Sequence, residues 1–152
     1  MQASGVATAA DIANGLRSWL QVVKAYQTCY SVLSQELKPL DLSVAQHDVL
    51  TALHYEDGLS QQRLAEKLLV VKSNVTALLT RLEKRELIRR EVDAQDARVK
   101  RVYLSSEGQA LVERSLEVQC RVVRRMMSAL NKGEVAQLED MMRRVRGVLH
   151  KS

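Results

Sequence analysis

The sequence has no phenylalanine, one proline and six glycines among its 152 residues. Aromatic residues make up only 3% of the chain, so any hydrophobic core has to be built from aliphatic side chains. Because proline and glycine are the residues that interrupt helices, their scarcity favours long helices. Hydrophobic residues amount to 46% and charged residues to 27%, which is a globular composition and excludes a disordered chain. The length suits one compact domain or one subunit of a dimer.

No apolar run approaches the roughly 18–20 residues that are needed to span a bilayer. The opening stretch MQASGVATAA lacks both the charged region and the long apolar region of a signal peptide. We therefore expect residues 1–10 to form a short flexible tail, and the protein to be cytoplasmic and not associated with membranes.

The two cysteines, Cys29 and Cys120, lie too far apart in the sequence to suggest a disulfide framework or a metal site. Either both are small buried hydrophobic residues, or one of them senses oxidants. Cys120 precedes Arg121 and lies one helical turn before Arg124, and these cations would favour its thiolate form.

The sequence contains no nucleophile elbow, no glycine-rich phosphate loop and no HExxH motif. The histidines His47, His54 and His150 do not cluster with cysteines or carboxylates at the spacing of metal ligands. We therefore predict that the protein is not an enzyme and binds neither a metal ion nor a cofactor.

The formal net charge of +5 is concentrated in two segments. Residues 61–101 hold 11 basic and 6 acidic residues, and residues 121–152 hold 8 basic and 3 acidic residues, so each segment carries +5. Localised positive charge is typical of a surface that binds a polyanion, although charged surfaces often serve only to keep a protein soluble.

Apolar residues at helical spacing predict a long first helix from about Asp11, which would cap it, to Leu37. Three short amphipathic helices follow, and Ser43 and Ser60 are the expected caps of the first two. The third contains VKSNVTALLTR.

Two short runs with strand-like residues, Leu87–Val92 and Val99–Leu104, predict a β-hairpin after the short helices. Ser105 is then the expected cap of a helix over roughly residues 106–130. Asn131 and Glu134 have the spacing of a capping box for a last helix that ends near residue 149.

This order predicts a mainly α fold, a winged helix-turn-helix with long terminal helices. Residues 40–105 would form the DNA-binding lobe, and residues 11–38 and 106–152 would form dimerisation helices. The terminal helices carry long apolar stripes that a small lobe cannot cover. Burial against a second copy of the chain resolves this, although the helices could instead fold back within a monomer.

Small polar and basic side chains surround the apolar stripe of VKSNVTALLTR, as expected for a helix that reads the major groove. These are Lys72, Ser73, Asn74, Thr76, Thr80 and Arg81. Further candidate DNA contacts are Ser60, Gln61, Arg89, Arg90 and Lys100. The alternative is a solvated helix face without a ligand.

Four motifs in order resemble those of the MarR (multiple antibiotic resistance) winged-helix regulators over nearly the whole chain. LSVAQHDVLTAL is similar to the family's LTxxQxxxLxxL helix, and LSQQRLAEKL to its LxxLAxxL helix. VKSNVTALLTRLEKRELIRR resembles the recognition helix and the first wing strand. DAQDARVKRVYLSSEG resembles the wing signature, with Asp96, Arg98, Leu104, Ser105 and Gly108 in place.

The resemblance makes the hairpin a wing. Arg98 is then expected to enter a minor groove, where a narrow A·T-rich groove has an enhanced negative potential. Asp96 would hold its guanidinium in place, and Asp93 would shape the turn.

Three positions depart from the family pattern. Val71 stands where the family often has a capping serine or threonine, a loss for which Ser73 compensates in part. Glu86 replaces a glycine that commonly takes a positive φ, so it needs another geometry or accepts strain. Ala77 replaces a long polar residue, which predicts weaker base readout at that point.

The resemblance implies a homodimer with intertwined terminal helices, bound to double-stranded DNA at a pseudo-palindromic operator. It also implies repression relieved by a small effector, often a phenolic or other aromatic anion, bound between the dimerisation helices and the lobe. The residues that could contact such a ligand are Trp19, Tyr26, Tyr30, His47 and Tyr55. The same side chains could equally be core or interface residues.

Two alternative functions stay open at this point. One is a thiol-switched repressor of the same fold that uses Cys29 or Cys120 as its sensor. The other is a helical protein–protein adaptor whose basic surface is incidental.

Overall fold

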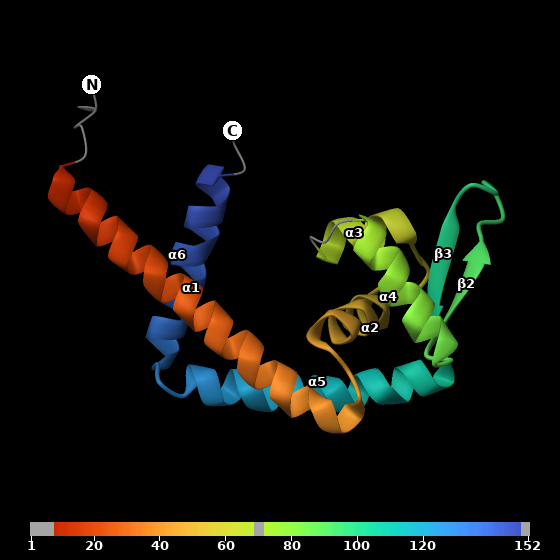
Figure 1. Cartoon of the computed structure of the whole chain (residues 1–152). Coiled ribbons are helices and arrows are strands. Elements are labelled where there is room, and N and C mark those ends of the chain that lie inside the picture. Colours follow the sequence, from red (N-terminus) through yellow and green to blue (C-terminus); the bar gives the residue numbers. More distant parts are fainter. Residues whose placement is uncertain (1–7, 69–71, 150–152) are drawn as a thin grey trace.

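The computed structural model describes residues 8–68 and 72–149, including all their side chains except those of residues 72, 73 and 149 (Figure 1). Its elements, in chain order, are α1 (Ala9–Leu37), the 3-10 helix η1 (Lys38–Leu40), α2 (Val44–Tyr55), β1 (Leu59–Ser60), α3 (Gln61–Leu68), α4 (Lys72–Lys84), β2 (Ile88–Val92), β3 (Lys100–Leu104), α5 (Ser106–Met127) and α6 (Lys132–Leu149). This confirms the predicted winged helix-turn-helix with long terminal helices.

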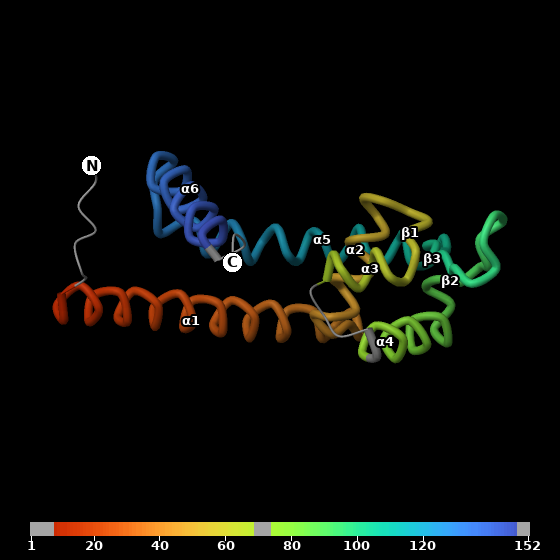
Figure 2. The backbone as a smooth tube through the Cα atoms, turned by 90° about the horizontal axis from the view of Figure 1, so that it is seen from above, coloured from red at the N-terminus to blue at the C-terminus, as the bar shows by residue number. Residues whose placement is uncertain are grey.

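The chain divides into a lobe and a set of arms. Helices α2, α3 and α4 and the small sheet form the lobe, and α1, α5 and α6 extend away from it (Figure 1). Seen from above, α1 and α5 leave the lobe in the same direction, and the β2–β3 hairpin lies at the opposite end of the molecule (Figure 2). Among the described residues, no helix combines the length and the apolar character that a membrane span requires.

The core of the lobe is aliphatic, as the absence of phenylalanine predicts. The large side chains that are fully buried there include Leu50, Leu53, Leu64, Leu79, Leu82 and Val102. Each such side chain stabilises the fold by roughly 1.5–3 kcal/mol relative to exposure. The helical stripes and the hairpin therefore meet in one core, which fixes α4 against α2, α3 and the sheet.

The predicted caps of the lobe and of the C-terminal helices are present. Ser43 forms a capping box with Gln46, and the hydroxyl of Ser60 accepts a hydrogen bond from the Arg63 N–H at 3.2 Å. Asn131 and Glu134 form the reciprocal pair expected at the start of α6, at 2.8 and 3.0 Å. These caps satisfy helix N–H groups that otherwise lack partners.

Two predicted helix boundaries were wrong. Thr8, not Asp11, caps α1, because the Thr8 hydroxyl accepts from the Asp11 N–H while the Asp11 carboxylate accepts from the Thr8 N–H. The expected tail of residues 1–10 therefore included two helical residues. Helix α5 ends at Met127 rather than near residue 130. Just after Met127, the Ser128 hydroxyl donates to the Arg125 carbonyl at 2.7 Å.

The sheet has three antiparallel strands in the order β1-β3-β2, one more than the predicted hairpin. In the hairpin, Ile88 pairs with Leu104 and Val92 with Lys100. The additional strand β1 consists of two residues and pairs with the other edge of β3. It ties the start of α3 to the base of the hairpin.

Glu86 adopts a left-handed backbone conformation, with φ of 57°. Its N–H donates to the Glu83 carbonyl at 2.9 Å, and the Leu87 N–H donates to the Leu82 carbonyl at 3.1 Å. This pair of hydrogen bonds is the Schellman arrangement that ends a helix. Glu86 thus adopts the left-handed conformation in which the family commonly has a glycine, and it accepts the backbone strain that this conformation imposes on an L-residue.

We expect Glu86→Gly to raise the free energy of unfolding by about 0.5–1 kcal/mol, because a left-handed L-residue costs roughly 1–2 kcal/mol and the added freedom of glycine offsets part of that gain. The measurement is urea unfolding at one fixed protein concentration. Glu86→Ala is the control and should give little gain, since alanine keeps the Cβ. An equal gain from both variants would place the effect in the side chain and not in the backbone.

Candidate nucleic-acid interface

Helix α4 presents a polar face outward from the lobe. Its apolar residues Val75 and Leu79 are buried, whereas Asn74 and Arg81 are exposed. The hydroxyl of Thr80 donates to the Thr76 carbonyl at 2.9 Å, so it is engaged within the helix.

Two further predictions concern Ala77 and the residues at the start of α4. Ala77 is exposed, so its short side chain leaves part of this face without a long polar group. Val71 and the side chains of Lys72 and Ser73 lie outside the described residues, and the predicted cap at this helix start is among them.

The C-terminal end of α4 is joined to the wing and to α5 at one point. The Ser105 N–H donates to the Leu87 carbonyl at 3.1 Å, and its hydroxyl donates to the Glu86 carbonyl at 2.6 Å. The same hydroxyl accepts from the Gly108 N–H at 2.9 Å. A Cβ on Gly108 would lie 2.0 Å from the Leu87 oxygen, so only glycine permits this approach.

A second contact joins α4 to the end of the arm helix. One guanidinium nitrogen of Arg85 donates to the Asp41 carbonyl at 2.6 Å, and the other lies 3.6 Å from the Asp41 carboxylate. Asp41 follows η1 and has a φ of 52°, the left-handed conformation. The recognition helix is therefore held both from the wing side and from the arm side.

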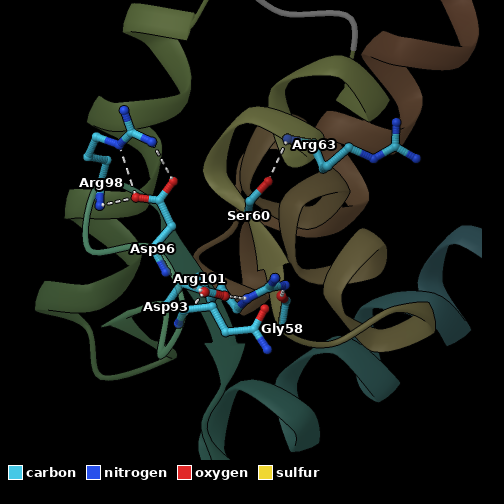
Figure 3. Close-up of polar contacts among 8 residues, drawn as sticks. Gly58, Ser60, Arg63, Asp93, Asp96, Arg98 and Arg101 are labelled. Atoms are coloured by element: carbon cyan, nitrogen blue, oxygen red, sulfur yellow. Dashed lines mark hydrogen bonds and ion pairs between the residues drawn. The ribbon is translucent and has the colours of Figure 1, made fainter.

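The β2–β3 hairpin, here called the wing, is shaped by Asp93 (Figure 3). One carboxylate oxygen of Asp93 accepts from the N–H groups of Gln95 and Asp96, at 2.8 and 3.1 Å. The other accepts from Arg101, which also donates to the Gly58 carbonyl at 2.9 Å. The Arg101 hydrogen bond is the main cause that lowers the pKa of Asp93. The predicted turn-shaping role of Asp93 matches this geometry.

Arg98 lies at the tip of the wing, and its side chain is 91% exposed. Its Nε and one terminal nitrogen donate to the two carboxylate oxygens of Asp96, at 3.0 and 3.1 Å (Figure 3). The Arg98 N–H also donates to Asp96, at 3.0 Å. These hydrogen bonds lower the pKa of Asp96, which keeps it ionised at neutral pH. The guanidinium is thus held in a defined direction while most of it still faces solvent.

A groove of about 210 Å³ lies between the wing and the start of α3. Its lining residues are Ser60, Gln61, Gln62, Arg98, Val99 and Lys100. The fold therefore gathers four of the predicted DNA contacts, from the α3 end and the wing. Gln62 was not predicted, and the adjacent Gln61 was the signal that could have found it. The buried Oε1 of Gln61 has no hydrogen-bond partner among the described residues.

Both arginines of β2 contact nearby side chains, Arg89 within the wing and Arg90 on α4. Arg89 lies 4.7 Å from the centre of the Tyr103 ring and donates to Glu91 at 2.7 Å. Arg90 is largely buried, and its Nε donates to Glu83 at 3.0 Å. This pairing is the main cause that lowers the pKa of Glu83. Arg89 remains accessible to a phosphate, whereas Arg90 serves mainly to fix β2 to α4.

A second concave site lies where α1, α2 and α5 meet. Tyr26 and Tyr30 line this cleft, with ring centres 6.0 Å apart. Of the other predicted ligand contacts, Trp19 lies about two turns earlier on α1 and does not line the cleft, and neither does Tyr55, whose ring packs edge-on against His54.

His47 lies behind the wall of the cleft and is completely buried. Its Nδ1 is 2.9 Å from the Ser115 hydroxyl, and the neighbouring Gln119 side chain offsets part of the pKa decrease that burial causes. Burial lowers the pKa of His47 and favours the neutral imidazole. Of the five predicted ligand contacts, the structure thus brings only the two tyrosines together.

The cysteines do not pair with each other. Both are free, with Cys29 half-buried and Cys120 exposed on α5. The Cys29 sulfur lies 2.7 Å from the Met126 sulfur, at the edge of the cleft. Within residues 8–68 and 72–149, no group of three histidines, cysteines or carboxylates is placed to hold a metal ion.

Comparisons with known proteins agree on one family. The model of the MarR family matches residues 42–100, from the start of the α2 region to the wing. An uncharacterized HTH-type transcriptional regulator from Bacillus cereus is 33% identical over 128 residues, which cover 84% of this chain and 85% of the relative.

Solved structures give the same result. The S. aureus MepR–DNA complex aligns with a TM-score of 0.78 and 28% identity, covering 86% of this chain and 96% of that protein. A mutant of E. coli MarR in complex with operator DNA aligns with a TM-score of 0.77 and 25% identity, covering 82% and 90%. Both of these neighbours were solved in complex with DNA.

Proposed function

Because the chain belongs to the MarR family of transcriptional regulators, we propose that this DNA-binding winged-helix protein is a homodimeric repressor released from a pseudo-palindromic operator by a small ligand. The observation that carries the DNA-binding part is the wing tip, where Asp96 orients an Arg98 side chain that is 91% exposed. A cation that is held in one direction and kept in solvent is suited to a negatively charged groove. Because the chain belongs to a family of transcriptional regulators, we propose this function in place of the protein–protein adaptor.

The exposed apolar surface of the arms supports the homodimer. On α1, Leu16 and Trp19 are 58% and 61% exposed, and on α6, Val145 and Val148 are 54% and 72% exposed. Within the described residues, α6 packs extensively against no other element. A soluble protein rarely leaves such stripes in water, so they are expected to be covered by a second copy of the chain.

The lobe and wing then define how the dimer meets DNA. The polar face of α4 enters the major groove, and Arg98 enters the neighbouring minor groove. In a two-fold dimer, the two recognition helices would lie about 34 Å apart, one turn of the duplex. Ser60, Gln61 and Lys100 line the groove between α3 and the wing, which supports phosphate contacts by these residues between the two points.

The cleft between α1, α2 and α5 supports ligand control, because it lies between the arms and the lobe. A ligand bound there needs only to favour a lobe spacing that does not fit successive major grooves. Its effect is limited by the difference between its affinities for the two spacings. Tyr26 and Tyr30 are the proposed contacts.

We expect Arg98→Ala to weaken binding to a fragment of the protein's own promoter by roughly tenfold, about 1.4 kcal/mol, because the minor-groove contact is lost. Fluorescence anisotropy at about 0.15 M salt measures the affinity. Thermal unfolding should be unchanged, since the Arg98 side chain is 91% exposed and its hydrogen bonds within the described residues go to Asp96. Arg146→Ala on α6 is the control and should bind like the wild type. Unchanged affinity in Arg98→Ala would remove the wing from the mechanism.

Val145→Asp should convert the dimer to a monomer at micromolar concentration, because a carboxylate in an apolar interface costs several kcal/mol unless it is paired. Sedimentation velocity reports the change. Arg143→Asp introduces the same side chain on the opposite face of α6 and should remain dimeric. A dimeric Val145→Asp protein, or a monomeric wild type, would contradict the proposed interface.

A further inference from the structure

The cleft between α1, α2 and α5 has walls of different character. Its volume is about 250 Å³, which suits a small molecule with one or two rings. Leu33, Val44, Val122 and Val123 supply aliphatic surface. Figure 1 shows the three helices converging beside the lobe, so that a bound molecule would contact both the lobe and an arm.

Among the described residues that line this cleft, Asp48 is the one carboxylate, and none is a lysine or an arginine. Within the described part of the chain, its side chain forms no hydrogen bond and no ion pair. Asp48 is exposed at the mouth of the cleft, yet the surrounding side chains displace enough water to raise the pKa of its carboxyl. A carboxylate in this position gains stability from any cation that enters.

The neighbouring His47 does not neutralise Asp48. Its positive form would lower the pKa of Asp48, but burial lowers the pKa of His47 itself and favours the neutral ring. The charge of the Asp48 carboxylate is therefore not balanced by a basic side chain in the described lining of the cleft. A negative potential inside a partly apolar site attracts cations and repels aromatic carboxylates.

The tyrosines add a second feature that favours a cation. The rings of Tyr26 and Tyr30 are tilted by 42° to each other, with centres 6.0 Å apart. Both line the cleft and remain partly exposed, so their faces are available to a ligand. Aromatic faces attract ammonium groups, and the attraction is stronger where water is displaced. Gln119 adds an amide that can accept a hydrogen bond from an ammonium group.

We propose that this cleft binds a small aromatic cation, such as an arylalkyl primary amine or a quaternary ammonium, and discriminates against aromatic carboxylates. Asp48 pairs with the positive charge, Tyr26 and Tyr30 contact it through their ring faces, and the aliphatic wall takes the aromatic body. This inference rests on the effector-controlled function proposed above, and names the chemical class of its effector. It differs from the aromatic anion that the family resemblance implies.

A neighbouring groove offers the contrasting environment. It shares Cys29, Val122 and Met126 with the cleft, but its charged residue is Arg125. Because the two sites differ in their charged residue, a substitution of Asp48 distinguishes binding in the cleft from binding in that groove.

The test uses three probes of nearly the same shape: 2-naphthylmethylammonium, the neutral 2-naphthylmethanol and the anion 2-naphthoate. Isothermal titration on the free full-length protein measures each affinity. We expect the cation to bind at least roughly tenfold more tightly than the anion, with the neutral probe between them. Preferred binding of the anion, or no measurable binding of any probe, would overturn the proposal.

Asp48→Asn keeps the shape of the side chain and removes its charge. It should weaken binding of the cation by about tenfold and leave the affinity for the neutral alcohol unchanged. Glu117→Gln makes the same chemical change on an exposed part of α5 outside the cleft and should have no effect. A charge preference that survives in Asp48→Asn would contradict the assignment, since the cation would then be bound elsewhere.

Release from operator DNA is measured separately, by anisotropy with the same probes. Asp48-dependent cation binding without operator release would support the ligand class and contradict the effector-controlled function. Operator release by the anion alone would support the effector-controlled function and contradict the ligand class.

Discussion

The close approach of Gly108 to the Leu87 carbonyl is the constraint on which the rest of the structure depends. At this point a few hydrogen bonds join the end of α4, the first strand of the wing and the first turn of α5. Ser105 makes three of them, and its hydroxyl alone both donates to the Glu86 carbonyl and caps α5. The left-handed conformation of Glu86 turns the chain from α4 toward the wing at the same place.

This junction connects the wing, the end of α4 and the start of α5 directly. The proposed ligand control requires that a movement of α5 reaches the base of the wing through Ser105, and α4 through the carbonyls of Glu86 and Leu87. The Arg85 contact to Asp41 adds a second connection, from α4 to the end of α1. In the proposed function, a ligand in the cleft between α1, α2 and α5 contacts two arm helices and the lobe. A small shift there would then change the spacing of the two lobes across the proposed dimer.

Much of the lobe could be predicted from local sequence signals. Capping by Ser43, Ser60 and Ser105, and the pairing of Asp96 with Arg98, depend on residues within a few positions of each other. The two-residue strand β1 could not be predicted, because it exists only through pairing with β3, more than 40 residues later. The start of α1 was missed because Asp11 was read as the cap and not as the partner of Thr8.

The cleft was harder to predict than the wing. Trp19, Tyr26, Tyr30 and Tyr55 are equally aromatic in the sequence, and only packing shows that two of them share a site. Nothing in the sequence marks Asp48 as a ligand contact, since a single carboxylate in an amphipathic helix normally faces water. Its importance depends on the aliphatic residues that α1 and α5 place around it.

In the proposed complex, two copies of this chain read DNA together, with α4 in the major groove and the wing in the minor groove. Hydroxyl-radical footprinting of the protein on its own promoter fragment tests this most directly. We expect two protected regions related by a two-fold axis, with their centres about one helical turn apart and with protected deoxyriboses in the minor groove where the wings lie. A single unsymmetrical region, or two regions without protected deoxyriboses at the expected wing positions, would contradict this arrangement.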